Sequence, residues 1–299
     1  MNDLLSPKQV ARAIGLSESS IKRYCDQGAI HFVRTLGGHR KLPLSDVLRF
    51  VKEREHVIVV PGALGLPTRS QRSEIGLERG VRILVDALIK GNEESVWQVV
   101  YDLYLARHSI STICDRLMIP AFREIRERWA SSSIEVYQER RSCEFLQRVL
   151  FNLRSTLKAP DKEWDACGGT LEDDTNSLPN AMAELVLRDC LWNATSLGTS
   201  IPFDSMVNAL SDMKPRLFWL TATRISDIDR FVKQVESLSQ IAEANGVAFL
   251  VGGRAVDEDL RRRLAGLSCQ VCESLQQLEN LARSMRRAGA TNAGLETES

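Results

Sequence analysis

The sequence predicts a multidomain protein of the α plus α/β class. Three observations carry this prediction: two short capped helices near the N-terminus, an apolar period of three to four residues through the middle, and apolar strands alternating with amphipathic helices at the end. The expected parts are a head, a linker, a four-helix bundle, a five-stranded sheet domain and a disordered tail, at residues 1–56, 57–74, 75–158, 164–285 and 286–299.

The head begins with two helices. Ser6 and Pro7 are a capping hydroxyl and a first-turn proline, and Gly15 ends that helix. Ser17 then caps a second helix, so the pair forms a helix-turn-helix. The outward residues of the second helix have side chains that hydrogen-bond phosphates and base edges, and we expect them to bind DNA: Ser19, Ser20, Lys22 and Arg23.

A β-hairpin follows, with strands IHFVR and HRKLP around the turn TLGG, and Ser45 is expected to cap a third helix. On its own this could be a small helical domain with a harmless solvated hairpin. The combination resembles the MerR-like and excisionase-like winged helix-turn-helix domains. The resemblance implies that the second helix enters the major groove of double-stranded DNA. It also implies that the hairpin, as a wing, holds phosphates through Arg34, His39, Arg40 and Lys41.

The charge is unevenly distributed. The formal net charge is +0, but residues 1–56 hold ten Lys and Arg against six Asp and Glu, a balance of +4 that leaves −4 for the rest. A basic head on a mildly acidic body favours an anion-binding module, such as one for nucleic acid.

The composition is that of an ordinary globular protein, with 299 residues, 43% of them hydrophobic and 26% charged. No apolar run reaches the length of a membrane span, and the first residues lack a signal-peptide layout, so we expect a bacterial cytoplasmic protein with no membrane partner. Seven cysteines, an odd number, favour reduced thiols. Cys269 and Cys272 have CxxC spacing, but with no second pair or histidine near them we expect buried thiols and no metal site.

Residues 57–74 contain two prolines and two glycines and are expected to be a flexible connector. Four helices are expected after it, at 75–90, 93–107, 110–129 and 134–157. Trp129 ends the third of these helices, and Glu139 lies in the fourth. Taken alone, they would be an interfacial Trp and a surface Glu.

The C-terminal pattern predicts a parallel, doubly wound, flavodoxin-like sheet. Its five strands are expected at 164–170, 192–197, 216–222, 246–252 and 268–272. Its helices are expected at 178–190, 203–212, 226–244, 256–264 and 274–285. Ligands of such sheets bind at the carboxyl ends of the strands, so we expect any ligand to contact the loops after the first, third and fourth strands.

This order of head, bundle and sheet resembles the light- and cobalamin-responsive regulators of the CarH, CarA and LitR family. The resemblance implies a D/E-x-H-x-x-G motif after the first strand, whose histidine binds cobalt. Counting back from Leu197-Gly198 places that motif at residues 174–179, where Asn176 replaces the histidine and Pro179 replaces the glycine. An amide is a much poorer ligand for cobalt than an imidazole.

No residue after His108 can supply an imidazole, so a small error in the alignment cannot restore either ligand histidine. The four histidines are His31, His39, His56 and His108. The family's W-x9-E-H motif of the bundle stands here as Trp129, Glu139 and then arginine.

The resemblance also implies a pocket for the nucleotide tail of the cofactor, lined by Thr221, Thr223, Gly252 and Gly253. We expect the cofactor pocket to be retained in outline, with Trp129, Glu139 and Asn176 among its residues, and its cobalt chemistry to be lost. The alternative is that these residues are ordinary strand ends of any such sheet. The acidic run of residues 172–174 is expected to be a solvated loop.

We therefore expect a DNA-binding transcriptional regulator with no catalytic residues and no bound cofactor. Its partners would be double-stranded DNA, further copies of itself and a regulatory protein. One alternative is a cobalamin-dependent regulator, including a light-responsive one, that binds the cofactor without a protein histidine. The other is a corrinoid carrier of an enzyme system, which would need the missing histidine.

Overall fold

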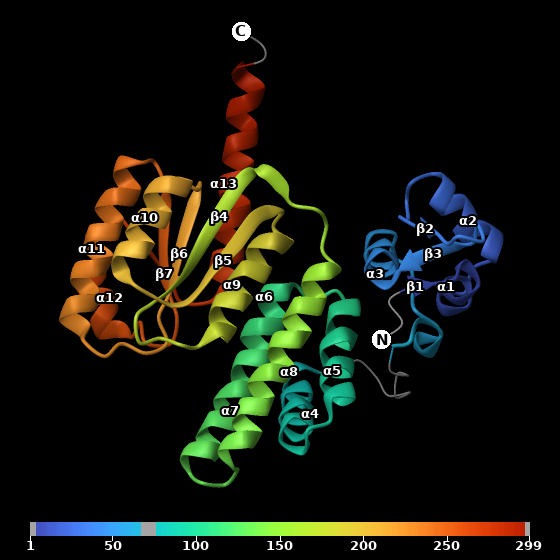
Figure 1. Ribbon diagram of the computed structural model, residues 1–299, viewed down its shortest axis with the longest axis horizontal. Helices are drawn as coiled ribbons and strands as arrows, with labels where there is room; N and C mark the ends of the chain where they lie inside the picture. The colour runs from blue at the N-terminus through green and yellow to red at the C-terminus, as the bar shows by residue number, and fades with distance from the viewer. Residues whose placement is uncertain (1–3, 67–75, 297–299) are drawn as a thin grey trace. The chain divides into compact units, whose positions relative to one another are not determined.

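The computed structural model describes residues 4–66 and 76–296, which form two compact units. One unit comprises Met1–Ser109 with Arg116–Lys158, and the other comprises Ile110–Asp115 with Ala159–Ser299. Each unit is described by itself below (Figure 1). Among the described helices, none combines the length and apolarity needed to cross a bilayer.

The head is a helix-turn-helix with a small antiparallel sheet, in the strand order β1-β3-β2. Ser6 caps the first helix in a capping box with Gln9, and Gly15 ends it with a φ of 70° that a glycine adopts without strain. Its elements are β1 (Leu4–Leu5), α1 (Pro7–Ile14), α2 (Glu18–Asp26), β2 (Val33–Arg34), β3 (Arg40–Pro43) and α3 (Leu44–Glu53).

The expectation that Ser45 caps the third helix is wrong. Helix α3 begins at Leu44, its N-cap is Pro43, and no side chain caps it. Pro43 is still paired with Leu4 in the sheet, so β3 leads directly into α3 and leaves no residue free to act as a capping side chain.

The segment that follows α3 is folded as far as residue 66, which corrects the expected flexible linker. Ile58, Leu64 and Leu66 are buried, and the N–H groups of Val59 and Val60 donate to the carbonyl of Ala13 in α1. A short 3₁₀ turn, Pro61–Leu64, lies within it. Ile58, Leu64 and Leu66 are thus part of the core of the head, whereas Val57 and Val59 stay exposed. The remainder of the expected linker lies outside the described residues.

The bundle contains the four predicted helical runs. Its elements are α4 (Leu77–Lys90), α5 (Glu93–Leu105), α7 (Ile119–Ala130) and α8 (Val136–Ser155). The first turn of the third run, α6 (Ile110–Ile113), belongs to the unit of the α/β domain. The third run is interrupted by a π-helical turn, Cys114–Met118, between α6 and α7. Pro120, at the start of α7, has no N–H to donate back to residue 116, which explains why the helix widens there.

The α/β domain has the predicted parallel sheet, with the strand order β5-β4-β6-β7-β8. The order reverses at β4, because the chain moves from β4 outward to β5 and then returns to pair β6 with β4. Its elements are β4 (Asp161–Leu171), α9 (Ser177–Asp189), β5 (Trp192–Ile201), α10 (Phe203–Met213), β6 (Leu217–Thr221), α11 (Ile228–Ala244), β7 (Ala248–Gly252), α12 (Glu258–Leu264), β8 (Gln270–Cys272) and α13 (Leu275–Glu296).

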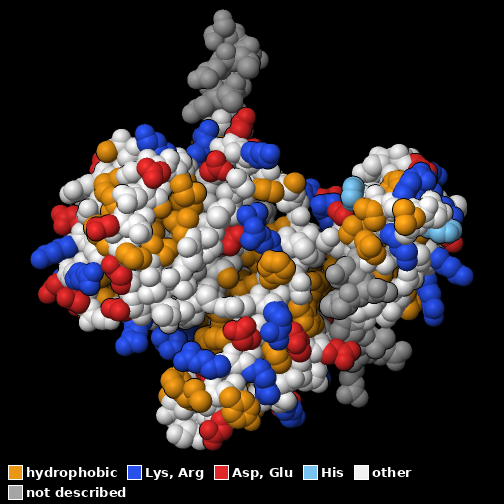
Figure 2. Space-filling model, in the orientation of Figure 1, with side chains coloured by type: hydrophobic (Ala, Val, Ile, Leu, Met, Phe, Trp, Pro, Cys, Tyr) orange, Lys and Arg blue, Asp and Glu red, His pale blue; other side chains and the backbone are white. Residues whose placement is uncertain are grey.

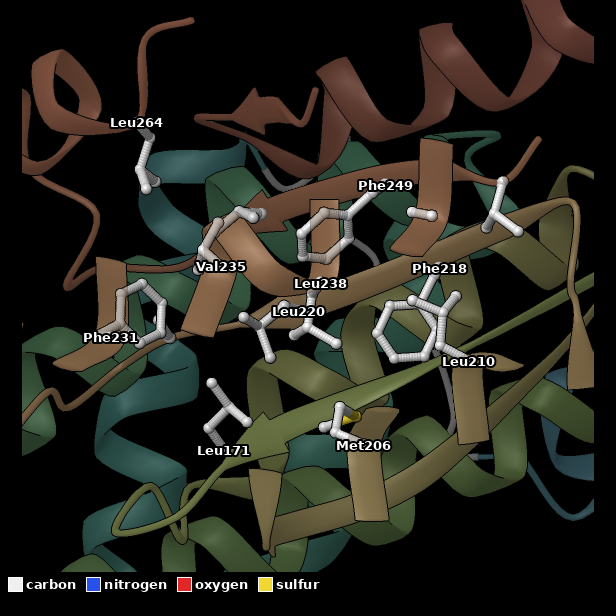
Figure 3. Close-up of a cluster of buried hydrophobic side chains, with 14 of the residues drawn as sticks. Leu171, Met206, Leu210, Phe218, Leu220, Phe231, Val235, Leu238, Phe249 and Leu264 are labelled. Carbon is white, nitrogen blue, oxygen red and sulfur yellow. The ribbon is translucent and has the colours of Figure 1, made fainter. Parts of the chain in front are cut away.

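The two faces of this sheet are covered by different helices (Figure 1). Phe218, Leu220 and Phe249 belong to a core that the strands share with α10, α11 and α12 (Figure 3). Side chains alternate along a strand, so Trp219 lies on the opposite face, where its indole contacts Asn180 of α9.

Helix α13 extends to Glu296, which corrects the expected disordered tail from residue 286. A Cβ at Gly289 would lie 2.6 Å from the ring of Trp164, so the glycine lets the helix pack closely on that tryptophan. Arg286 adds a cation–π contact, with its guanidinium 5.2 Å from the Trp164 ring centroid.

Candidate nucleic-acid interface and corrinoid-type site

The N-terminus of α2 carries three serine hydroxyls close together. Ser17 caps the helix by accepting from the backbone N–H of Ser20, and its Oγ lies 2.8 Å from the Oγ atoms of both Ser19 and Ser20. Hydroxyls and free N–H groups at a helix N-terminus are suited to binding a phosphate. Ser19 and Ser20 therefore lie where the predicted contact needs them.

The predicted cations of α2 differ in what they already contact. Lys22 Nζ lies 2.8 Å from Glu18 Oε1, one turn earlier on the same exposed face. That hydrogen bond and the lysine charge hold the pKa of Glu18 below its usual range, so the pair is ionised at neutral pH. Arg23 lies over the ring of Tyr24, 5.9 Å from its centroid. Arg23 is thus the α2 cation with no acidic partner in the described part of the head.

The hairpin β2–β3 has a fixed turn. Val33 pairs with Lys41 and Arg34 pairs with Arg40. The N–H of Thr35 donates to the carbonyl of His39 at 2.9 Å, and the N–H of Gly38, whose φ is 77°, donates back to the carbonyl of Thr35 at 2.8 Å. The turn therefore closes on backbone hydrogen bonds and on a glycine in the left-handed conformation.

Arg40 is already bound within the head. Its guanidinium lies 2.5 Å from Asp26 at the end of α2 and 5.3 Å from the ring centroid of Phe32. Its Nε is buried and finds no hydrogen-bond partner among the residues that the structure describes. This geometry makes Arg40 a residue that positions the wing against α2, which differs from the free phosphate contact that the sequence predicts.

The other wing cations remain available to an anion. Arg34 and His39 are exposed and Lys41 is half-buried, and no ion pair holds Arg34 or Lys41 within the described residues. Figure 2 shows Lys, Arg and His side chains standing out on the surface of the head. Sequence reasoning missed Phe32 and Asp26. The spacing of Phe32 and Arg34 by two residues in a strand was the signal that they share a face.

In the bundle, Trp129 and Glu139 lie in different environments. Trp129, near the end of α7, is 40% exposed. Glu139, in the first turn of α8, is only 5% exposed, and its Oε2 has no hydrogen-bond partner among the described residues, although Arg140 Nε lies 3.5 Å away. Glu139 is therefore not the surface residue that its position alone would indicate. The pocket role that the resemblance implies for Trp129 and Glu139 stays a prediction.

At the carboxyl edge of the sheet, Asp174 joins the loops after β4 and β6. Its carboxylate accepts from the N–H of Thr223 at 2.5 Å, from the Thr223 hydroxyl at 2.6 Å and from the N–H of Arg224 at 3.3 Å. Asp174 is 3% exposed, so it is not part of a solvated acidic loop. Asp173 beside it is exposed, as expected.

The other predicted pocket residues also bind the protein itself. Asn176 is the N-cap of α9 and accepts from the N–H of Leu178 at 3.4 Å, and Thr221 donates to the carbonyl of Gly169 at 3.4 Å. A Cβ on Gly252 would lie 2.9 Å from the carbonyl oxygen of Cys272, and one on Gly253 would clash with the backbone of the loop after β6. These glycines allow backbone segments to approach each other closely.

The space between α9 and the reversal point of the sheet is filled by a tryptophan that sequence reasoning did not single out. Trp219 is 2% exposed, and its Nε1 donates to Asn180 Oδ1 at 2.7 Å. Asn180 Nδ2 in turn donates to Ser196 Oγ at 2.6 Å and to the carbonyl of Gly198 at 3.1 Å. Under the indole, a Cβ on Gly168 would lie 2.5 Å from the ring. The indole and the amide thus close this face of the domain.

An open hollow of about 510 Å³ lies on the other side of the sheet, between the N-termini of α10 and α11. Glu172, Asp227, Arg230 and Lys233 line it, so both signs of charge are present. Partial burial opposes ionisation of Glu172, but hydrogen bonds from the N–H of Phe203 and from its surroundings hold its pKa below the usual range. None of the predicted pocket residues lines this hollow.

The cysteine pair does not form a reactive site. Burial raises the pKa of Cys269, and it raises the pKa of Cys272 to about 11, so both are thiols at neutral pH. Among the described residues, no group of three or more His, Cys, Asp or Glu could hold a metal ion.

Two family models match parts of the chain. Residues 4–55 match a helix-turn-helix domain, and residues 81–154 match a B12 binding domain. No curated protein matches the chain. The protein therefore combines an N-terminal helix-turn-helix domain with a B12-binding type of region.

Three solved structures to which the chain is similar bear names that mention a corrinoid or cobalamin. The monomethylamine corrinoid protein of Methanosarcina barkeri has a TM-score of 0.56 and 13% identity, covering 70% of this chain and all of its own. A cobalamin-binding protein from Desulfitobacterium hafniense DCB-2 has a TM-score of 0.35 and 18% identity over 71% and 98% of the two chains. The methanol:cobalamin methyltransferase complex MtaBC from Methanosarcina barkeri has a TM-score of 0.38 and 15% identity over 79% and 91%. At these identities the first of these matches shows the fold alone.

Proposed function

We propose that this protein is a transcriptional regulator of the MerR-like type that binds double-stranded DNA through its head. The observation that carries the proposal is the exposed cationic surface of α2 and the wing, where Arg23, Arg34 and Lys41 have no acidic partner within the described residues. The match of residues 4–55 to a helix-turn-helix domain supports it. Such a protein works at the nucleoid in the cytoplasm and has no catalytic role.

We further propose that the corrinoid-type region acts without cobalamin held by a histidine. The residues present do not fit that cofactor. The position of the cobalt ligand is Asn176, which caps α9, and Asp174 beside it is saturated by Thr223 and Arg224. On the α9 face of the sheet, Trp219 and Asn180 are buried and hydrogen-bonded to each other, so this face is occupied by the protein's own side chains.

The role left to this region is assembly of the regulator and response to a partner protein or another ligand. Regulators of this type act on repeated half-sites, and a symmetric oligomer places two heads on two half-sites. We therefore propose a homo-oligomer whose C-terminal domains join the copies and receive the regulatory protein.

A second candidate is a regulator that binds cobalamin without a protein histidine, including a light-responsive one. Two observations favour it: the match of residues 81–154 to a B12 binding domain, and the buried Glu139, whose Oε2 accepts no hydrogen bond among the described residues. A corrinoid carrier of an enzyme system would need an imidazole that the region after His108 does not contain.

One set of measurements on the purified full chain tests these proposals. Fluorescence anisotropy should give tight binding to the DNA upstream of its own coding sequence, and a shuffled duplex should bind more weakly. The double variant Arg34→Ala/Lys41→Ala should weaken binding to both duplexes and lower the salt slope by about one unit for each lost phosphate contact. An unchanged affinity and slope would contradict the proposed DNA interface.

The cofactor is tested in parallel. The chain is expressed with hydroxocobalamin in the medium, passed through gel filtration, and its absorption spectrum and mass are recorded. We expect a colourless oligomer. A corrinoid spectrum that stays with the protein would favour the second candidate, and a shift of that spectrum in light would establish a photoresponsive form of it.

A further inference from the structure

The tip of the wing carries a large apolar side chain that no internal packing explains. Leu36 has an exposed fraction of 112%, against 71% for Phe151, the next highest among the described large apolar side chains. A leucine in water contributes nothing to the core of the head. Single exposed apolar residues are common on protein surfaces, so its surroundings decide whether it has a role.

The turn that presents Leu36 is rigid. The N–H of Gly38 donates to the carbonyl of Thr35 at 2.8 Å, and the N–H of His39 donates to the Thr35 hydroxyl at 3.2 Å. Gly38 has the positive φ that this turn requires. Leu36 is thus held at the outermost point of the hairpin.

The base of the wing is held as firmly as its tip. Arg40 ties β3 to Asp26 of α2 by an ion pair of 2.5 Å, and the guanidiniums of Arg34 and Arg40 both lie over the ring of Phe32, at 5.7 and 5.3 Å. The hairpin therefore has a fixed direction relative to α2. When α2 contacts DNA, the position of α2 therefore also sets the position of the tip of the wing.

The surroundings of Leu36 are polar and cationic. Arg34 precedes it by two residues, and His39, Arg40 and Lys41 follow it. An apolar protein groove would be complementary to a patch of several apolar side chains, whereas the tip of the wing carries a single apolar side chain, Leu36. A single apolar side chain on a hairpin that also carries Arg34 and Lys41, which have no ion pair within the described residues, is complementary to the minor groove of DNA, which combines a strongly negative potential with apolar sugar and base surfaces.

We propose that Leu36 is inserted into the minor groove as an apolar wedge that partly unstacks one base step and bends the duplex. The inference rests on the proposed DNA binding of the head and adds a contact that phosphate neutralisation does not supply. Its partner is a flexible step, pyrimidine followed by purine, because such steps unstack at the lowest cost. Arg34 and Lys41 then hold the phosphates on either side of the opened step.

The experiment compares full-length variants on the duplex from upstream of the coding sequence, with a donor dye at one end and an acceptor dye at the other. Energy transfer reports the bend and anisotropy reports the affinity. Leu36→Ala removes the wedge, Leu36→Met keeps a long apolar side chain, and Val57→Ala is the control, because Val57 is 65% exposed and lies outside the wing. Both positions are exposed, so folding should be unchanged, which circular dichroism checks.

We expect wild type, Leu36→Met and Val57→Ala to bend the duplex and to bind it equally well. Leu36→Ala should lose most of the bend and about tenfold in affinity, since burial of a leucine is worth roughly that factor. Its salt slope should match that of the wild type, because no phosphate contact is removed. This pattern would support the wedge.

Three results would overturn it, each for a different reason. A wild type that binds no DNA overturns the proposed function and the wedge together. If the wild type binds DNA, and Leu36→Ala bends the duplex and binds it as well as the wild type does, the wedge alone is overturned. A Leu36→Ala variant with normal bending but a smaller mass in sedimentation without DNA would make Leu36 a contact between proteins and would also overturn the wedge.

Discussion

The head and the α/β domain both carry polar side chains where a ligand is expected, and they differ in what those side chains already bind. In the head, Arg34 and Lys41 have no acidic partner within the described residues. At the carboxyl edge of the sheet, Asp174 and Asn180 each make two or more hydrogen bonds within the domain. Arg34 and Lys41 in the head thus keep donors for a partner. Asp174 and Asn180 use their hydrogen bonds to hold the loops and α9 of their own domain.

This difference separates a binding surface from a fold that resembles one. Buried polar groups need partners, and a site that binds a ligand leaves some of them for that ligand. A site that has satisfied its groups internally gains stability instead. The α/β domain should therefore lose stability when these residues are replaced, whereas the head should lose affinity.

The largest effect is expected for Trp219→Ala. The change removes a fully buried indole and leaves Asn180 Oδ1 without its donor at 2.7 Å, so the free energy of unfolding should fall by about 4 kcal/mol. Urea denaturation followed by circular dichroism measures it. The result would sharpen the comparison by showing that the indole is a structural part of the domain.

A milder variant keeps this prediction measurable if the alanine variant does not fold. Trp219→Phe preserves most of the ring and loses only the indole N–H, which should cost about 1 to 2 kcal/mol. If Trp219→Ala instead left stability unchanged and began to retain hydroxocobalamin, the tryptophan would be a movable plug, and the contrast between the two regions would fail.

The next effect is expected for Asp174→Ala. Three donors from Thr223 and Arg224 would lose their acceptor, and those of Thr223 are buried, so the free energy of unfolding should fall by about 3 kcal/mol. Asp173→Asn is the matched control, because Asp173 is the exposed neighbour with a φ of 69° that asparagine tolerates. Equal stability of the two variants would contradict a structural role for Asp174.

The structural role of Asp174 also marks the limit of what the sequence predicts. The order of elements, the helix caps at Ser6 and Ser17 and the five parallel strands depend on local pattern, and the structure confirms them. The environment of Asp174 depends on Thr223, which lies 49 residues further along the chain. Nothing in the run of acidic residues around Asp174 indicates that this one is buried and its neighbour is not.

The partners of Trp219 and Arg40 could not be predicted from the local sequence pattern, for the same reason. The partner of Trp219 is 39 residues away, and the partner of Arg40 is 14 residues away on another element. The sequence places the wing cations correctly on the hairpin, but it does not distinguish the one held by Asp26 from those that stay free. The assignment of the DNA-binding residues as a group remains a prediction.

A smaller effect is expected from Arg40 and Asp26. If Arg40 positions the wing, then Arg40→Ala and Asp26→Ala should each lower the thermal stability of the protein, and a double-mutant cycle should give a coupling of about 0.5 to 1 kcal/mol. The value is modest because the Asp26 side chain is 57% exposed. Differential scanning calorimetry provides the numbers. Additive effects, with zero coupling, would return Arg40 to the set of free phosphate contacts.

The smallest effect is expected from Glu18, the acidic residue on the side of α2 that we propose to face DNA. Its carboxylate lies 2.8 Å from Lys22 Nζ and opposes an approaching phosphate. Glu18→Gln should free the lysine and remove a repulsive charge, so DNA should bind about two- to threefold more tightly and with a steeper salt dependence. Anisotropy at two or more salt concentrations measures both quantities.

Glu55→Gln is the control for this gain, because it removes the same charge from an exposed position after the end of α3. If both variants gain equally, the effect is one of net charge, and Lys22 need not touch DNA. If only Glu18→Gln gains, Lys22 is a contact that the free protein keeps partly occupied. The head would then also contain an internal pair, Glu18 with Lys22, but one that DNA can displace, because an exposed ion pair opens at little cost. The buried, hydrogen-bonded carboxylate of Asp174 in the α/β domain does not open in this way.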